Sequence, residues 1–248
     1  MNLLPLATAV QYDQSFLFYL CSVFATVVGA VAGATAYSRQ RMDVVGIVAC
    51  GTIASLGGGT VRDILLSGFC RPDGSPVTVY WMTWPDTEFL IEALATSLVI
   101  FVISRYARVL PVGTIRISDA FSMAFFSLLG AAKCYFLGCP YIVCICMGVT
   151  TGVAGGALRD VLTGNIPYVF RSNEVYASAS MAGCIIFIIM MSCDLAVEPA
   201  FITGTVVVFL TRMAAVWLNW RVPSYQPLFE KPHIEQPAHT EDCPRKSE

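Results

Sequence analysis

Two closely similar stretches place an arginine and an aspartate side by side inside long apolar runs. The first reads Gly-Gly-Gly-Thr-Val-Arg-Asp over residues 57–63, and the second reads Gly-Gly-Ala-Leu-Arg-Asp over residues 155–160. Charges at membrane depth are costly unless they find partners, and they often mark ion or solute pathways. These residues could therefore lock two parts of the protein together, or they could also set the field of a permeation path. The candidate charge network consists of Arg62, Asp63, Arg159 and Asp160.

Consecutive glycines precede each Arg–Asp pair. A glycine run permits non-helical backbone, so we predict a helix break roughly 20 Å into the membrane, where freed backbone groups could line a cavity. The alternative is that the glycines only allow helices to pack closely. Thr60 could cap the half-helix after the first break, whereas Ala157 cannot do so in the second stretch. The candidate pore and hinge residues are Gly57, Gly58, Gly59, Gly155, Gly156 and Thr60.

The two Arg–Asp pairs lie 97 residues apart. Adjacent residues on a helix project about 100° apart, so Arg62 and Asp63 are expected to be poor partners for each other. We predict pairing between the copies instead, of Arg62 with Asp160 and of Arg159 with Asp63.

Three further ionisable residues are candidates for gating. Lys133 lies near one end of a predicted span, where it would either snorkel to the interface or place a cation in the path. Glu174 begins a span, where a helix N-terminus favours a carboxylate. Asp119 lies inside the fourth apolar run.

Composition indicates a polytopic membrane protein. Of the 248 residues, 56% are hydrophobic and 13% are charged, whereas soluble domains are about a quarter charged. The formal net charge of −2 excludes a basic field for nucleic acid. Both histidines lie in the polar C-terminal tail, and most cysteines lie in apolar runs as packing residues. We therefore expect no catalytic residue, no metal site, no cofactor other than a permeant K⁺ or Na⁺, and no enzymatic activity.

Seven apolar runs are predicted to cross the membrane, at residues 16–37, 44–66, 88–104, 117–137, 141–162, 174–192 and 199–220. The bias of Lys and Arg among the loops predicts a multi-pass protein of the plasma (inner) membrane with its N-terminus outside and its C-terminus in the cytoplasm.

The repeated motif divides the chain. We expect an N-terminal extracytoplasmic tail (1–15), a first three-helix repeat (16–110), a second repeat (111–196), a seventh helix (197–220) and a disordered cytoplasmic tail (221–248). Three spans per repeat is an odd number, so the second repeat must be inverted relative to the first. Phe24 and Gly29 match Phe125 and Gly130 in this alignment.

Aromatic residues gather in the connections after the two motifs. Tyr80, Trp81, Trp84 and Tyr168 are typical of membrane interfaces. The alternative is that part of the loop at residues 67–87 caps the mouth of a pore.

The doubled motif resembles that of a bacterial membrane family, the glycine-transporter-domain family, also described as the prokaryotic branch of the trimeric intracellular cation (TRIC) channels. Arg41-Met42-Asp43 and Glu174-Val175-Tyr176-Ala177 also resemble it, and the resemblance runs from residue 16 to about residue 220. It implies an all-α polytopic membrane protein with seven transmembrane helices, an inverted 3+3 repeat plus one extra helix, and kinks at the glycines of spans two and five. It also implies a homotrimer with one pore per protomer, and Lys133 resembles the lysine on the fourth helix of the family.

The leading functional hypothesis is a passive channel for monovalent cations such as K⁺, with a pore in each protomer lined by the second and fifth helices, which the glycines are expected to break. The alternative is a transporter of glycine or a similar small zwitterion, and a purely structural protein is a third class. The expected partners are the lipid bilayer, identical protomers, and a small ion or small amino acid as the permeant.

Overall fold

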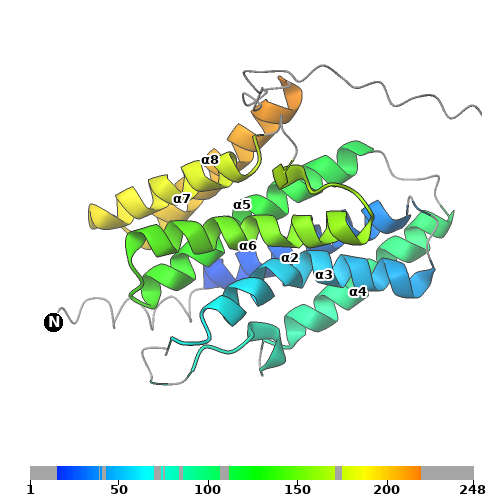
Figure 1. The fold of residues 1–248 in the computed structure, drawn as a ribbon, viewed down its shortest axis with the longest axis horizontal. Helices are drawn as coiled ribbons and strands as arrows, with labels where there is room; N and C mark the ends of the chain where they lie inside the picture. Colours follow the sequence, from blue (N-terminus) through cyan, green and yellow to red (C-terminus); the bar gives the residue numbers. More distant parts are fainter. Residues whose placement is uncertain are drawn as a thin grey trace, which may run out of the picture.

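The computed structural model describes residues 16–38, 40, 43–69, 74, 76–83, 86–106, 112–170 and 175–218. Within these residues the chain forms seven α-helices and two short 3-10 helices (Figure 1). The α-helices are α2 (Phe16–Ser38), α3 (Val44–Leu65), α4 (Glu88–Tyr106), α5 (Val112–Phe136), α6 (Tyr141–Leu162), α7 (Ala177–Ser192) and α8 (Val197–Trp217). The predicted terminal tails, Glu174 and Trp84 lie outside the described residues.

The α-helices confirm the all-helical prediction and follow the predicted runs. The largest difference is at α5, which begins at Val112 rather than at residue 117. Six of the seven helices in the described residues are long and apolar enough to cross a membrane. The exception is α7, whose 16 residues extend about 24 Å, less than the roughly 30 Å of a hydrocarbon core.

Local signals determine where the central helices begin and end. Asp43 precedes α3, and its side chain accepts a hydrogen bond of 2.8 Å from the N–H of Gly46. Gly138 and Gly164 follow α5 and α6 with positive φ angles of 74° and 69°. A left-handed residue after a helix allows the last carbonyl groups to be satisfied, and glycine adopts it without strain. Because α6 ends there, its Arg–Asp pair is held in the final turn.

The helices form two groups of three. Helices α2, α3 and α4 pack on one another, as do α5, α6 and α7, and the groups meet along α2–α5 and α3–α6. Helix α8 packs against α5 and α7. Large apolar side chains such as Ile91 and Leu210 remain exposed on the outside of the chain, as contact with lipid requires.

The backbones of helices α3 and α6 touch where the two helices cross, and glycines lie at the contact. A Cβ on Gly58 would collide with the carbonyl oxygen of Thr151, and a Cβ on Gly155 would collide with that of Ala54. These contacts are reciprocal, because Gly155 and Thr151 each lie 97 residues beyond Gly58 and Ala54. The partners run in opposite directions along the two helices, so α3 and α6 are antiparallel.

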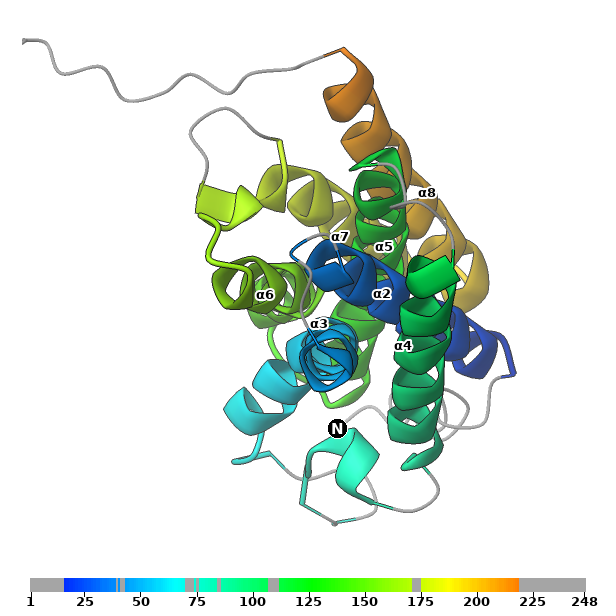
Figure 2. The ribbon, with the colours of Figure 1, turned by 90° about the vertical axis from the view of Figure 1, so that its right-hand side faces the viewer.

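The predicted helix breaks are wrong. Both α3 and α6 continue as helices through their glycines. Figure 2 looks nearly along the first part of α3 and shows that its last part leans away, so the helix bends without interruption. Each consecutive glycine instead leaves space for a different neighbouring side chain. A Cβ on Gly57 would lie 2.7 Å from Leu158, and a Cβ on Gly59 would lie 2.6 Å from the Tyr80 ring.

The same shift of 97 residues relates α2 to α5. A Cβ on Gly33 would contact Cys50 and Ala54 of α3, and a Cβ on Gly130 would contact the residues 97 positions later in α6. The predicted match of the first and fourth runs, which paired Gly29 with Gly130, is therefore wrong by four residues. The error arose because glycine spacing alone does not define the helix register.

We expect Gly58→Ala to destabilise the protein by about 1–3 kcal/mol, the usual range for overpacking, because its new methyl group meets backbone that cannot rotate away. Gly113→Ala is the matched control. Nothing lies within 4 Å of a Cβ there, so only the favourable effect on helix propensity, up to about 1 kcal/mol, remains. Thermal or denaturant unfolding of the purified protein measures both. Equal stability of the two variants would contradict the backbone contact at Gly58.

Candidate functional site

The first charge network lies at the C-terminal end of α3 and consists of Arg62, Asp63 and Lys133. Arg62 Nε donates to Asp63 Oδ1 at 2.8 Å, and Lys133 Nζ donates to the same oxygen at 2.9 Å. The Asp63 side chain is fully buried. Two cations surround one carboxylate, so the formal charge of this network is +1.

A short 3-10 helix, η1 (Tyr80–Met82), folds back over this network. The Tyr80 N–H donates to Asp63 Oδ2 at 3.1 Å, and the Arg62 guanidinium lies 5.9 Å from the centre of the Tyr80 ring. Burial raises the pKa of the Tyr80 phenol, so the ring stays neutral beside the charges. Tyr80 therefore contacts the charged groups directly, and the capping of a pore mouth by this loop stays a prediction.

Thr60 forms a hydrogen bond with η1 and does not cap a half-helix. Its hydroxyl donates to the Leu56 carbonyl at 2.8 Å, and it accepts a 2.9 Å hydrogen bond from Trp81 Nε1. The capping prediction is wrong because α3 continues past Gly59, which leaves no helix start for Thr60 to cap.

The second charge network lies at the C-terminal end of α6 and consists of Arg159, Asp160 and Asp119. Arg159 Nε donates to Asp160 Oδ1 at 2.9 Å, and its Nη1 donates to Asp119 Oδ1 at 2.6 Å. The Tyr168 N–H donates to Asp160 Oδ2 at 3.0 Å, and the Arg159 guanidinium lies 5.8 Å from the Tyr168 ring. One guanidinium group therefore bonds two carboxylates here.

Arg212 of α8 flanks the second network. Its guanidinium lies 4.7 Å from the centre of the Tyr176 ring, and its Nη1 donates to the Val175 carbonyl at 3.1 Å. A Cβ on Gly156 would lie 2.5 Å from the Tyr176 hydroxyl. The absence of a side chain at Gly156 therefore leaves space for the tyrosine ring over which Arg212 lies. Sequence reasoning did not place Arg212 at the site, although an arginine in the middle of an apolar run is itself a signal.

The predicted pairing between copies is wrong. Each arginine pairs with the aspartate that follows it, Arg62 with Asp63 and Arg159 with Asp160. Two physical reasons account for this. An arginine side chain is long enough to reach the carboxylate of the next residue, as the Nε–Oδ1 bonds show. The antiparallel crossing also places the two networks at opposite ends of the α3–α6 pair, roughly 20 Å apart at 1.5 Å of rise per residue.

Lys133 turns inward. Its side chain is 16% exposed, and its ammonium group bonds Asp63. The structure therefore favours a cation inside the protein over simple snorkelling. Asp119 likewise belongs to the second network rather than standing alone.

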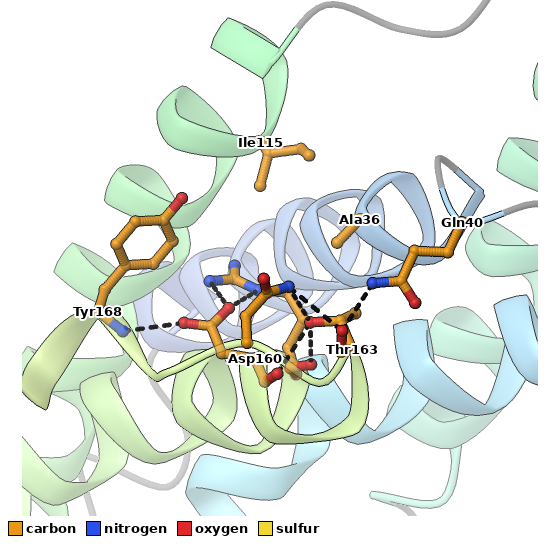
Figure 3. Close-up of a pocket in the computed structure, with 8 residues that line it drawn as sticks. Ala36, Gln40, Ile115, Asp160, Thr163 and Tyr168 are labelled. Carbon is orange, nitrogen blue, oxygen red and sulfur yellow. Dashed lines mark hydrogen bonds and ion pairs between the residues drawn. The ribbon is translucent and has the colours of Figure 1, made fainter. Parts of the chain in front are cut away.

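A cavity of about 330 Å³ lies beside the second network. In Figure 3, Ala36 of α2 and Ile115 of α5 face Asp160, Thr163 and Tyr168 across this space. A hydrogen bond links two residues that line this cavity, since Gln40 Nε2 donates to the Thr163 carbonyl at 2.7 Å. The cavity is lined by Ala36, Gln40, Ile115, Arg159, Asp160, Thr163, Asn165 and Tyr168.

Known proteins resemble this chain along most of its length. The family model described as glycine transporter matches residues 19–105 and 116–192. The inner membrane protein YadS of Escherichia coli is 33% identical over 210 residues, which cover 84% of this chain and 96% of YadS.

Solved structures share the fold. The TRIC trimeric intracellular cation channel orthologue from Rhodobacter sphaeroides is 28% identical, covers 83% of this chain and 100% of its own, and superposes with a TM-score of 0.73. A second TRIC cation channel, whose structure addressed conductance, is 25% identical, covers 85% of this chain and 98% of its own, and gives a TM-score of 0.72. The chain is therefore a multi-pass membrane protein, not an enzyme, and it belongs to the glycine-transporter (TRIC) family.

Proposed function

We propose that this protein is a channel for monovalent cations such as K⁺, with a path inside each protomer that passes between the two charge networks along α3 and α6. The observation that carries this proposal is the placement of two buried charge networks at the two ends of one helix crossing. The structural relatives named as TRIC cation channels support it. We further propose that the chain forms a homotrimer.

The first network would act as the barrier in this path. The ammonium group of Lys133, which bonds Asp63 at 2.9 Å, would repel a cation that approaches this end of the path. A lysine that leaves this position would leave Arg62 and Asp63 as a neutral pair, and the electrostatic barrier would fall. In this proposal, the bond between Lys133 and Asp63 belongs to a closed state of the channel.

A transporter of glycine or a similar small zwitterion is the second candidate, and the family description favours it. A zwitterion would present its carboxylate to cations and its ammonium to carboxylates. The networks lie roughly 20 Å apart along the helices, so one small molecule cannot engage both ends at once. This separation favours ions that pass one site after another.

We expect Lys133→Met to raise the K⁺ flux into liposomes several-fold, because the apolar stem remains while the blocking charge is lost. Lys133→Arg is the matched control; it keeps a cation able to reach Asp63, and the flux should stay near that of the unmodified protein. Flux is measured per correctly assembled protein. Equal fluxes for the two variants would rule out an electrostatic barrier at Lys133.

The same liposomes distinguish the two functions. Labelled glycine uptake that exceeds the leak of empty liposomes, without K⁺ flux, would reject the channel in favour of the transporter. In a transporter, Lys133→Met should lower glycine uptake, because the lysine is then a partner for the substrate carboxylate.

We also expect the C-terminus to lie in the cytoplasm and the N-terminus outside, as the distribution of Lys and Arg predicts. Reporter fusions at the two ends, one active only in the cytoplasm and one only outside it, measure this directly. The same location for both ends would contradict an odd number of crossings, and with it the role of the short helix α7 as a span.

A further inference from the structure

Two cysteines lie on either side of the turn that follows α5. Cys134 lies in the last turn of α5, and Cys139 precedes Pro140, where the chain enters α6. The two residues are 0% and 5% exposed, and both belong to the main hydrophobic core. Both are free thiols in the structure. Two thiols are therefore placed together at one end of the α5–α6 pair.

The backbone of this turn holds the two cysteines close to each other. The Cys139 N–H donates to the Cys134 carbonyl at 3.1 Å, and the Gly138 N–H donates to the Tyr135 carbonyl at 3.0 Å. With the positive φ angle of Gly138, these two bonds form a Schellman motif, in which the first and last side chains commonly touch. The bond between the two cysteines limits their Cα–Cα distance to about 7 Å at most, and a disulfide needs about 4.4–6.8 Å.

The two thiols also interact with each other. The Cys134 side chain is a hydrogen-bond partner of the Cys139 thiol. A third thiol, that of Cys144, donates instead to the Cys139 carbonyl at 3.4 Å. Cys144 therefore bonds the backbone of the turn, and Cys134 is the partner of the Cys139 side chain. A disulfide bond is about 2 Å long, so a small rotation of the two side chains would bring their sulfur atoms together.

The corresponding end of α2 is fixed by a different bond. The shift of 97 residues that relates α2 to α5 places Tyr37 at the position of Cys134. Tyr37 Oη donates to the Leu162 carbonyl of α6 at 2.7 Å. The much shorter cysteine side chain cannot reach across to a neighbouring helix in this way. The thiol of Cys134 lies instead beside the Cys139 thiol.

The proposed topology places this turn outside the cytoplasm. With the N-terminus outside, α2, α3, α4 and α5 cross the membrane in succession, so the chain is outside again where α5 ends. Disulfides form and persist in such compartments, because thiols are not kept reduced there. Gly138 and Pro140 are exposed, so the turn reaches the surface although Cys139 itself is buried. The compartment therefore favours oxidation of the pair.

We propose that Cys134 and Cys139 form a disulfide bond that closes the end of α5. The oxidant is a disulfide of another protein outside the cytoplasm. The Cys139 thiolate attacks one sulfur of that disulfide and releases the other as a thiolate. The Cys134 thiolate then attacks the Cys139 sulfur of the mixed disulfide and releases the second thiolate of the oxidant. The two thiol protons pass to these two thiolates, so one dithiol is oxidised and one disulfide is reduced.

Burial determines when this bond forms. It raises the pKa of the Cys139 thiol, so little of the reactive thiolate is present at neutral pH in the folded protein. Cys134 is 0% exposed, so an oxidising protein cannot reach its sulfur once the helices are packed. The exchange therefore takes place during folding, before α6 packs against α5, and the finished bond is shielded from reduction.

The bond would restrain the lysine of the first charge network. Lys133 precedes Cys134 in the last turn of α5 and bonds Asp63 at 2.9 Å. The shift of 97 residues places Ala36 at the position of Lys133, so the α5 copy alone carries a charge there. A crosslink in this turn opposes movement of Lys133 away from Asp63 and so favours the closed state. This consequence rests on the proposed function, whereas the bond itself does not.

Mapping of the thiols by mass spectrometry tests the bond. Membranes that contain the full chain are dissolved in denaturant with one alkylating reagent, then reduced and treated with a second reagent of different mass. We expect Cys134 and Cys139 to carry the second label only. Cys134→Ala should leave Cys139 with the first label. Cys144→Ala is the matched control; it removes a buried thiol beside the same turn and should leave the labels on Cys134 and Cys139 unchanged.

Two results would overturn the bond. One is the first label on both Cys134 and Cys139 of the unmodified protein. The other is a crosslinked peptide that joins Cys139 to Cys144 before reduction. The unmodified protein alone decides the question if Cys134→Ala fails to fold.

The K⁺ flux into liposomes separates the bond from the proposed function. We expect Cys134→Ala to raise the flux about threefold, because the turn that carries Lys133 is no longer crosslinked. Cys144→Ala should change the flux little. A mapped disulfide in a protein without K⁺ flux would reject the channel and keep the bond. K⁺ flux through a protein whose Cys134 and Cys139 are both free would keep the channel and reject the bond.

Discussion

The cost of burying charge constrains this structure more than any other factor. The four charged residues of the repeated motif are each no more than 6% exposed in a chain that is mostly apolar: Arg62, Asp63, Arg159 and Asp160. An ion buried alone costs several kcal/mol, so each must meet an opposite charge at hydrogen-bonding distance. The chain meets this requirement locally, by placing each pair in the last turn of a helix. The segment that follows then folds back, and a tyrosine N–H bonds the second carboxylate oxygen.

The glycines meet a different constraint, the close approach of two backbones. Gly58 and Gly155 allow α3 and α6 to touch, and the crossing sets the distance between the networks. The glycines next to them leave space for side chains of other segments, such as Tyr80 beside Gly59 and Tyr176 beside Gly156. One run of small residues thus positions both the helix pair and the rings that cover its charges.

Much of the fold could be predicted from the sequence, because apolar length and bounding charges determine where membrane helices lie. Less of the candidate site could be predicted from the sequence. A run of glycines permits a break but does not require one, and no local rule shows that a neighbouring backbone uses the space. The pairing of Arg62 with Asp63 was missed because the helical angle between adjacent residues ignores the length of an arginine side chain. The cavity at Ala36 depends on a register between α2 and α5 that only the contacts of Gly33 and Gly130 reveal.

The duplicated motif has a consequence for symmetry. Two identical chains meeting at a two-fold axis must present identical groups at both ends of their crossing. Here both copies belong to one chain, so Lys133 could arise in one copy while Ala36 stayed small in the other. Joining the halves covalently removes the requirement that they be equal, and it gives the protein a polarity that an assembly of identical halves could never acquire.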